Sequence, residues 1–136
     1  MNLVGLNWVA VIAVTLFHFI LGSLWYSPIL MGNKWMSLMG VKKIDMKKED
    51  MNKAMVGGLL SGLLVSIVLA AFVVAMDVVT FADGATIGLW AWIGFVIPTA
   101  LMPVIYEKKH PMLFKIYIAY ELIAFVLIGG ILAIWI

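Results

Sequence analysis

Four long runs of apolar residues follow one another along the chain, each interrupted by only a few polar side chains. Each run is close to the roughly 20 residues that a helix needs to cross about 30 Å of hydrocarbon. Because unpaired backbone groups are too costly in lipid, each run is predicted to be helical, and none alternates in polarity like a barrel strand. We therefore predict one domain, residues 1–136, that is an all-α polytopic membrane bundle of four transmembrane helices. The predicted spans are about 4–26, 54–76, 87–106 and 112–136.

The polar stretches between these runs differ in length. Residues 77–86 and 107–111 are short, and the second of them is expected to join the last two helices as an antiparallel hairpin. Residues 28–52 form a longer segment, placed on the cytoplasmic surface, in which four apolar side chains at helical spacing predict a short amphipathic helix. Asp45 is a typical N-cap residue, so the second long helix is expected to begin beside it, before it enters lipid. The four apolar positions are Met31, Trp35, Leu38 and Met39.

Composition agrees with a membrane protein and excludes several kinds of chemistry. Apolar residues make up 65% and charged residues 12% of the 136 positions, against about 45–50% and about 25% in soluble domains. The chain has no cysteine, which excludes disulfides, thiolate metal sites and Cys nucleophiles. It has no arginine either, and its lysines flank apolar runs instead of forming a basic face, so no nucleic-acid partner is expected. No cofactor and no metal are expected, and an enzyme is the less favoured class.

All nine cationic side chains lie in or beside the first and third loops. In a four-span chain these loops share one side, and the positive-inside rule makes that side cytoplasmic. We therefore predict a multi-pass protein of the cytoplasmic (inner) membrane with both termini outside. The start of the chain lacks a basic n-region, so the first span is expected to be retained. A basic cluster beside the amphipathic helix is a candidate for binding anionic lipid headgroups, although topology alone would explain it. That cluster is Lys42, Lys43, Lys47 and Lys48.

A short motif closes the first span and is similar to a known family. The chain resembles a family of small prokaryotic membrane proteins known only as a domain of unknown function (number seventeen sixty-one). The resemblance implies a four-span bundle and little about activity. It extends through the glycine patterns of the third and fourth spans. The motif residues are Gly22, Leu24, Trp25, Tyr26, Ser27, Pro28 and Trp35.

Two ionisable residues, His18 and Glu121, fall deep inside predicted spans, where each costs about 2.5 kcal/mol or more. Counted at ~1.5 Å per residue, His18 lies about 10 Å and Glu121 about 14 Å from the cytoplasmic interface, so the first and fourth helices could pair them. Prolines 98 and 103 free backbone carbonyls in the third span. A polar centre for a proton or ligand is therefore predicted, and the alternative is a pair of satisfied core side chains. Ser61, Thr99 and Tyr117 are its further candidate members.

Small residues four apart mark two helix faces on which another backbone can approach closely. These faces predict packing within the bundle or contact between subunits. Their residues are Gly58, Gly62 and Ser66 in the second span, and Gly129 and Ala133 in the fourth.

Three classes of function remain open from the sequence. The favoured one is a homo-oligomeric membrane protein that binds or passes a proton or small solute at His18 and Glu121. The second is a structural or accessory subunit without transport activity. The third is a membrane enzyme that acts on lipid or quinone with the same two residues as acid and base.

Overall fold

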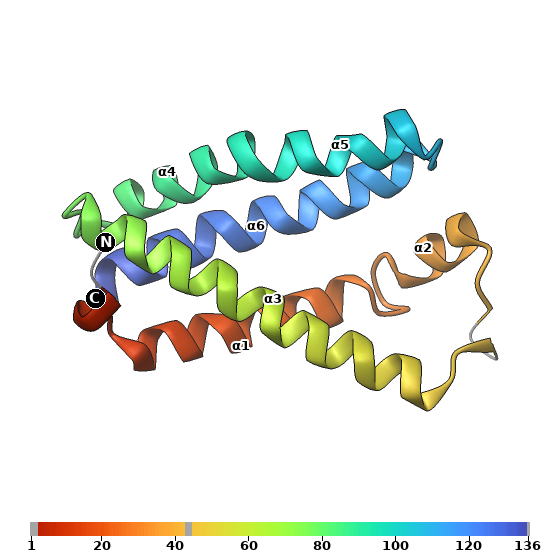
Figure 1. Cartoon of the computed structure of the whole chain (residues 1–136), viewed down its shortest axis with the longest axis horizontal. Helices are drawn as coiled ribbons and strands as arrows, with labels where there is room; N and C mark the ends of the chain where they lie inside the picture. Colours follow the sequence, from red (N-terminus) through yellow and green to blue (C-terminus); the bar gives the residue numbers. More distant parts are fainter. Residues whose placement is uncertain (1–2, 43–44, 136) are drawn as a thin grey trace.

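The computed structural model describes residues 3–42 and 45–135, and the helices in this part of the chain are arranged as four long rods (Figure 1). Four helices are long and apolar enough to cross a membrane: Trp8–Trp25, Lys48–Ala75, Phe81–Tyr106 and Pro111–Trp135. The described residues contain no strand. The predicted fold class, an all-α membrane bundle with a short helix after the first span, is confirmed.

The elements follow the chain in a simple order. A short 3-10 turn η1 (Leu3–Gly5) precedes α1 (Trp8–Trp25), and α2 (Gly32–Met39) is the short helix after the first span. The second long helix is α3 (Lys48–Ala75). The third is continuous through α4 (Phe81–Ala91), η3 (Trp92–Val96) and α5 (Ile97–Tyr106), and the fourth is α6 (Pro111–Trp135).

The third long helix begins at Phe81, six residues before the predicted span. Thr80 is its N-cap: the backbone N–H of Asp83 donates to the Thr80 hydroxyl over 3.1 Å, and that hydroxyl donates to the Asp83 carboxylate over 2.6 Å. Thr80 thereby satisfies a backbone N–H of the first turn that has no partner within the helix, and an acidic residue three positions after the cap supports this arrangement. The stretch predicted as a turn, 77–86, is therefore helical in its second half, because a capping pair outweighs its glycine and polar content.

The second long helix begins two residues later than Asp45 would place it. Lys47 is the N-cap of α3, and its side chain makes no capping hydrogen bond. The predicted N-cap role of Asp45 is therefore wrong. Glu49 and Asp50 still occupy the first turn of α3, where negative charge complements the helix dipole.

A five-residue π-helical segment, η3, interrupts the third span (Figure 1). The N–H of Ile97 donates to the carbonyl of Trp92, five residues earlier. Pro98 lacks an N–H for the carbonyl of Gly94 and its ring crowds that carbonyl, which is the usual cause of such a local widening.

The helices pack most closely at the end of the bundle that holds both termini. The largest fully buried side chains come from the first half of α1 and the last halves of α3 and α6. Asn7 connects the start of α1 to the end of α6. Its side-chain oxygen caps α1, and its side-chain N–H donates to the Trp135 carbonyl over 3.1 Å. The fully buried core side chains are Val11, Val14, Ser66, Leu69, Val73, Ile128 and Leu132.

Glycines bring α4 and α6 into backbone contact at the same end. A Cβ atom added to Gly84 would lie 2.2 Å from the Gly129 carbonyl oxygen, and one added to Gly88 would lie 2.0 Å from that of Phe125. Ala133 is buried against Gly84. The small residues of α6, Gly129 and Ala133, therefore face a neighbour within the chain.

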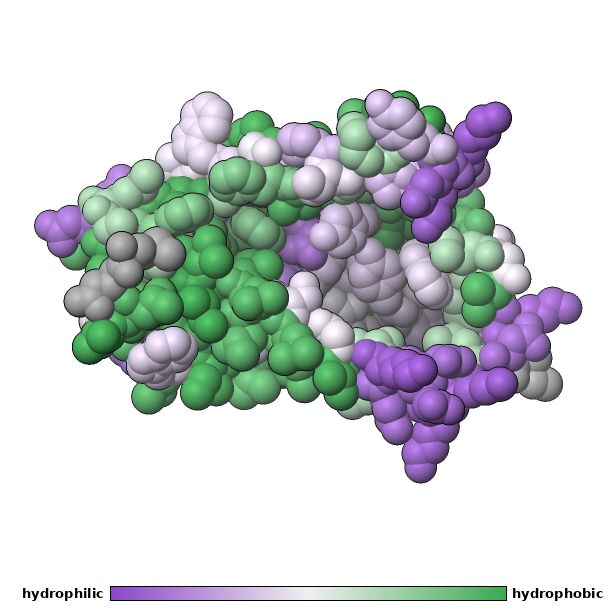
Figure 2. Space-filling model, in the orientation of Figure 1, coloured by the Kyte–Doolittle hydropathy of each residue, from purple (hydrophilic) through white to green (hydrophobic). Residues whose placement is uncertain are grey.

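The opposite end of the bundle is open and basic. In Figure 1 the start of α3 diverges from α5 and from the start of α6, and α2 lies between them. Figure 2 shows hydrophobic residues over the half of this face nearest the termini, hydrophilic side chains at the other end, and a hollow between them. Lys42, Lys47 and Lys48 are exposed at that end, and Lys43 lies outside the described residues. Anionic lipid binding by this cluster stays a prediction.

Candidate functional site

The structure brings His18 and Glu121 together. Nε2 of His18, on α1, lies 3.2 Å from Oε2 of Glu121, on α6. The two residues are 3% and 7% exposed. Both lie where the tightly packed half of the bundle ends, since no residue of α1 beyond His18 is buried.

Helical spacing places both side chains on the faces that meet. On α1 the buried positions Val11, Val14 and His18 recur at intervals of three and four. On α6, Glu121 shares its buried face with Ala124 and Ile128. Residues at such intervals lie on one side of a helix, so the pair extends the apolar contact of α1 with α6.

Tyr120 and Gly62 complete the surroundings of the imidazole. The ring of Tyr120 stacks on that of His18 with centroids 5.4 Å apart, and its hydroxyl donates to the His18 carbonyl over 3.3 Å. A Cβ atom added to Gly62, on α3, would lie 3.2 Å from His18 Nδ1. Within the described residues, Nδ1 is buried and has no hydrogen-bond partner.

Ser61 and Thr99 lie outside this centre, whereas Tyr117 adjoins it. Ser61 and Thr99 are exposed, and the Thr99 hydroxyl donates back to the carbonyls of Phe95 and Val96. Tyr117 is 39% exposed, but it lies one turn before Glu121 and its hydroxyl interacts with the Glu121 carboxyl. Counting residues gives the height of a side chain in a span but not the direction in which it points. The polar centre therefore contains the His–Glu pair, with Tyr117 beside it, and lacks the predicted Ser61 and Thr99 hydroxyls.

The predicted packing residues of α3 serve this centre. Gly62 leaves room for the His18 ring, and Ser66 is buried with its hydroxyl bound to the Gly62 carbonyl over 2.7 Å. Gly58 faces Phe19, whose ring would lie 3.5 Å from an added Cβ atom. These positions therefore face α1 of the same chain.

Two tryptophans bind backbone carbonyls of α6 shortly before Glu121, and neither was expected to do so. The indole N–H of Trp25 donates to the Ile116 carbonyl over 3.0 Å, and that of Trp92 donates to the Ile118 carbonyl over 2.9 Å. Trp25 belongs to α1 and Trp92 to η3. Because both bonds end within one and a half turns of Glu121, they fix the height and rotation of its helix.

The motif at the end of α1 builds the turn into α2 and part of the site wall. The backbone N–H of Gly32 donates to the Ser27 carbonyl over 2.9 Å, and the Ser27 hydroxyl donates to the Leu24 carbonyl over 2.6 Å. A Cβ atom at Gly32 would lie 2.3 Å from the Tyr26 carbonyl oxygen, so the turn requires glycine there. Leu24 and Pro28 are exposed.

The aromatic residues of the motif lie together. The ring of Tyr26 meets the edges of Trp35 and Tyr120, with centroids 6.1 and 6.0 Å apart. Gly22 makes room for the Tyr120 hydroxyl, which would lie 2.8 Å from an added Cβ atom. The motif thereby links α2 to Tyr120, the residue whose ring stacks on His18.

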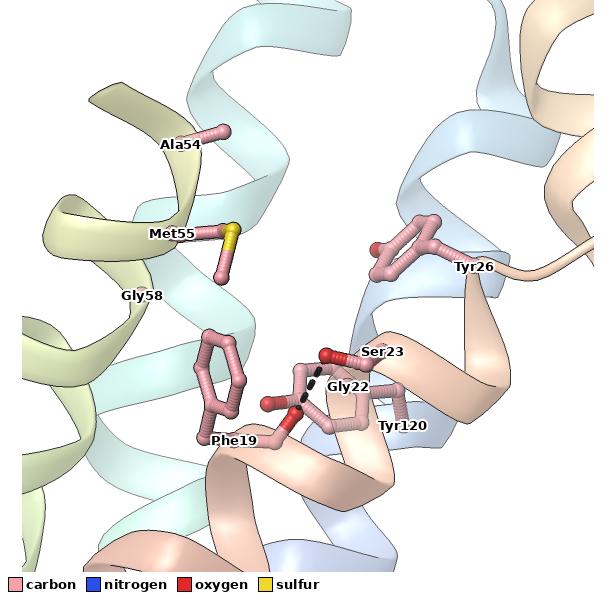
Figure 3. A pocket seen from close by; sticks show the side chains of 8 residues that line it. All are labelled: Phe19, Gly22, Ser23, Tyr26, Ala54, Met55, Gly58 and Tyr120. Carbon is pink, nitrogen blue, oxygen red and sulfur yellow. Dashed lines mark hydrogen bonds between the residues drawn. The ribbon is translucent and has the colours of Figure 1, made fainter. Parts of the chain in front are cut away.

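A cleft of about 360 Å³ separates α1 from α3 on the open side of the bundle. Figure 3 shows Ala54, Met55 and Gly58 of α3 on one side of it, with Phe19 and Tyr26 on the other. Tyr120 belongs both to the cleft wall and to the stack on His18, so it stands between the cleft and the buried pair. The remaining lining residues are Gly22 and Ser23.

The donor set around the pair does not form a metal site. Among residues 3–42 and 45–135, no three His, Cys, Asp or Glu side chains are grouped closely enough to hold an ion. The chemistry of the site is therefore that of one carboxyl group, one imidazole and the neighbouring phenol.

Comparison with known proteins identifies a family. A family model described as a protein of unknown function (DUF1761) covers residues 9–133. No curated protein matches the chain. No solved structure matches it either.

Proposed function

Because this chain belongs to the family described as a protein of unknown function (DUF1761), we propose a function from its own geometry: it binds or passes a proton, or a small solute, at the His18–Glu121 pair in the membrane. The observation that carries the proposal is the distance of 3.2 Å between two buried ionisable side chains. Ionisable groups at membrane depth are costly and are usually retained for function.

The pair has the protonation states that such a role requires. One proton is shared between Nε2 and Oε2, which leaves the pair with one negative charge. A second proton makes the pair neutral, and with the first still shared in that bond it resides on Nδ1, the other basic nitrogen of imidazole. Nδ1 has no partner among the described residues, and it is therefore the proposed position of the second proton.

Access to the pair is proposed from the basic end. The cleft reaches Tyr120, whose ring lies against the imidazole, whereas the terminal half of the bundle is filled by fully buried side chains. By the positive-inside rule the open, lysine-rich end faces the cytoplasm. The pair then exchanges protons with the cytoplasmic side in this conformation.

Passage across the whole membrane is proposed for an assembly of several copies. A four-helix unit of this size encloses little volume, and its terminal half is closed by core packing. Crosslinking in native membranes measures the copy number. A monomer under all mild conditions would remove the oligomeric part of the proposal and leave proton binding by one chain.

Proton flux in liposomes tests the function. The variant Glu121→Gln keeps the shape of the side chain and removes its titration, so we expect flux to fall by about tenfold or more. Glu107→Gln is the control, since Glu107 is an exposed loop residue paired with Lys109 at 3.8 Å. Absence of flux in the wild type, or equal flux in wild type and Glu121→Gln, would overturn the proposal.

A further inference from the structure

We propose that the cleft between α1 and α3 binds a neutral amphiphile, namely a ring with carbonyl acceptors on an apolar tail, which is the chemistry of a quinone. This site is distinct from the His18–Glu121 pair, because the ring of Tyr120 lies between them. The proposal therefore goes beyond proton binding and does not depend on it.

The cleft has the size and shape of a small-molecule site. Its volume of about 360 Å³ falls within the roughly 300–1,000 Å³ range of ligand pockets. It exists because α1 and α3 meet closely at Gly62 and His18 and diverge toward the open end of the bundle (Figure 1). Gly22 and Gly58 line it without side chains, and the rings of Tyr120 and Phe19 pack against them as part of the wall.

The lining excludes a charged ligand. It contains no Lys, Asp, Glu or His, although the lysine-rich end of the chain is near. A charged group placed there would lose its hydration without gaining a counter-charge. The apolar surface comes from Phe19, Ala54 and Met55, and aromatic and thioether side chains are good partners for a planar ring.

One hydrogen-bond donor remains available for the ring. Figure 3 shows that the hydroxyl oxygens of Tyr26 and Tyr120 both point from their helices toward α3. The Tyr120 hydroxyl donates to the His18 carbonyl and that of Ser23 to the Phe19 carbonyl. Within the described residues the Tyr26 hydroxyl has no such bond, while its ring is held between Trp35 and Tyr120. It is therefore a positioned donor for a ring carbonyl.

The depth of the cleft suits an amphiphile that enters from the bilayer. Gly58 lies five residues into α3 from Lys53, which is about 8 Å along the helix. A polar ring at this level stays near the interface while its tail lies among acyl chains. A plain acyl chain would make no use of the Tyr26 hydroxyl, and a phospholipid headgroup would need the cations that the lining lacks.

Titration of the protein in phospholipid nanodiscs with decylubiquinone tests this site, with quenching of tryptophan fluorescence as the readout. Trp25 precedes Tyr26, and Trp35 packs on it, so a bound quinone should quench in a saturable way. Gly58→Leu fills the cleft and should weaken binding about tenfold or more, provided that the variant remains folded. Gly57→Leu is the matched control, because a Cβ atom there meets nothing within 4 Å.

A second variant keeps the proposal testable if Gly58→Leu misfolds. Tyr26→Phe removes only the hydroxyl and should weaken decylubiquinone binding by about threefold to tenfold, the worth of one hydrogen bond. Decylbenzene, a ring without carbonyls, should bind more weakly and should not respond to Tyr26→Phe. Unsaturable quenching, or equal binding by wild type, Gly58→Leu and Tyr26→Phe, would overturn the site. Binding is measured without a proton gradient and flux without quinone, so either proposal can fail while the other stands.

Discussion

At the scale of single residues, two glycines and one carboxylate determine the environment of His18. Gly62 has no side chain, so α3 approaches the imidazole closely, and Gly22 has none, so the Tyr120 hydroxyl reaches α1. Among the residues that the structure describes, Glu121 supplies the only hydrogen bond of the imidazole ring. The pair is thus tightly enclosed, and the imidazole depends on Glu121 for its polar partner.

This dependence predicts a strong coupling between the two residues. Glu121→Met leaves both imidazole nitrogens without a partner and should lower the free energy of unfolding by about 1–3 kcal/mol. The double variant His18→Phe with Glu121→Met replaces the pair by apolar groups and should recover most of that loss. Unfolding in micelles measures the coupling. Glu49→Gln is the control, since its ion pair with Lys53 is exposed and 4.0 Å long; a double variant as unstable as the sum of the single ones would contradict the coupling.

At the scale of the helices, the contact of α4 with α6 is the most restrictive packing in the bundle. Gly84, Gly88 and Gly129 let the two backbones touch, which is how helices associate in lipid without a hydrophobic driving force. This contact also fixes Trp92 against α6. The geometry of the pair therefore depends on glycines more than a turn away from it.

A single methyl group should disturb that contact. Gly88→Ala would place a Cβ atom 2.0 Å from the Phe125 carbonyl oxygen, so the helices must separate, at about 1–3 kcal/mol or more. Gly94→Ala is the matched control, because the same atom meets nothing within 4 Å there. Thermal unfolding in detergent compares the two variants. An unchanged melting temperature for Gly88→Ala would show that the helices are not in contact at this point.

At the scale of the whole molecule, one end is closed and the other is open and basic. The closed end holds both termini and the fully buried core, and the open end holds α2, the cleft and the described lysines. The His18–Glu121 pair lies at the boundary between them. This position suits the proposed exchange of protons with one side of the membrane.

The side of the membrane that each end of the bundle faces can be measured by cysteine labelling, because the chain has no cysteine of its own. Lys42→Cys lies at the basic end and Val79→Cys in the loop after α3, where Val79 is 71% exposed. In intact cells a membrane-impermeant maleimide should label Val79→Cys only, and Lys42→Cys should react only after the cells are opened. Labelling of Lys42→Cys in intact cells would reverse the proposed orientation.

Several structural features could be read from the sequence. The lengths of the apolar runs predicted four membrane helices, and the spacing of Trp35 and its neighbours predicted the helix after the first span. Counting residues also placed His18 and Glu121 at similar heights. The start of α4 was not predicted, because Gly84 and the polar residues around it are typical of a turn, although Thr80 and Asp83 carry a capping signal.

The sequence by itself determined four helices long and apolar enough to cross a membrane, and it predicted similar heights for His18 and Glu121, because span length and rise per residue are properties of one helix. Only the tertiary structure decided which side of each helix faces the interior. In lipid both the buried and the outer face of a helix are apolar, so hydrophobic periodicity does not separate them. For that reason the sequence could not place Ser61 and Thr99 outside the centre, or Tyr120, Trp25 and Trp92 around it.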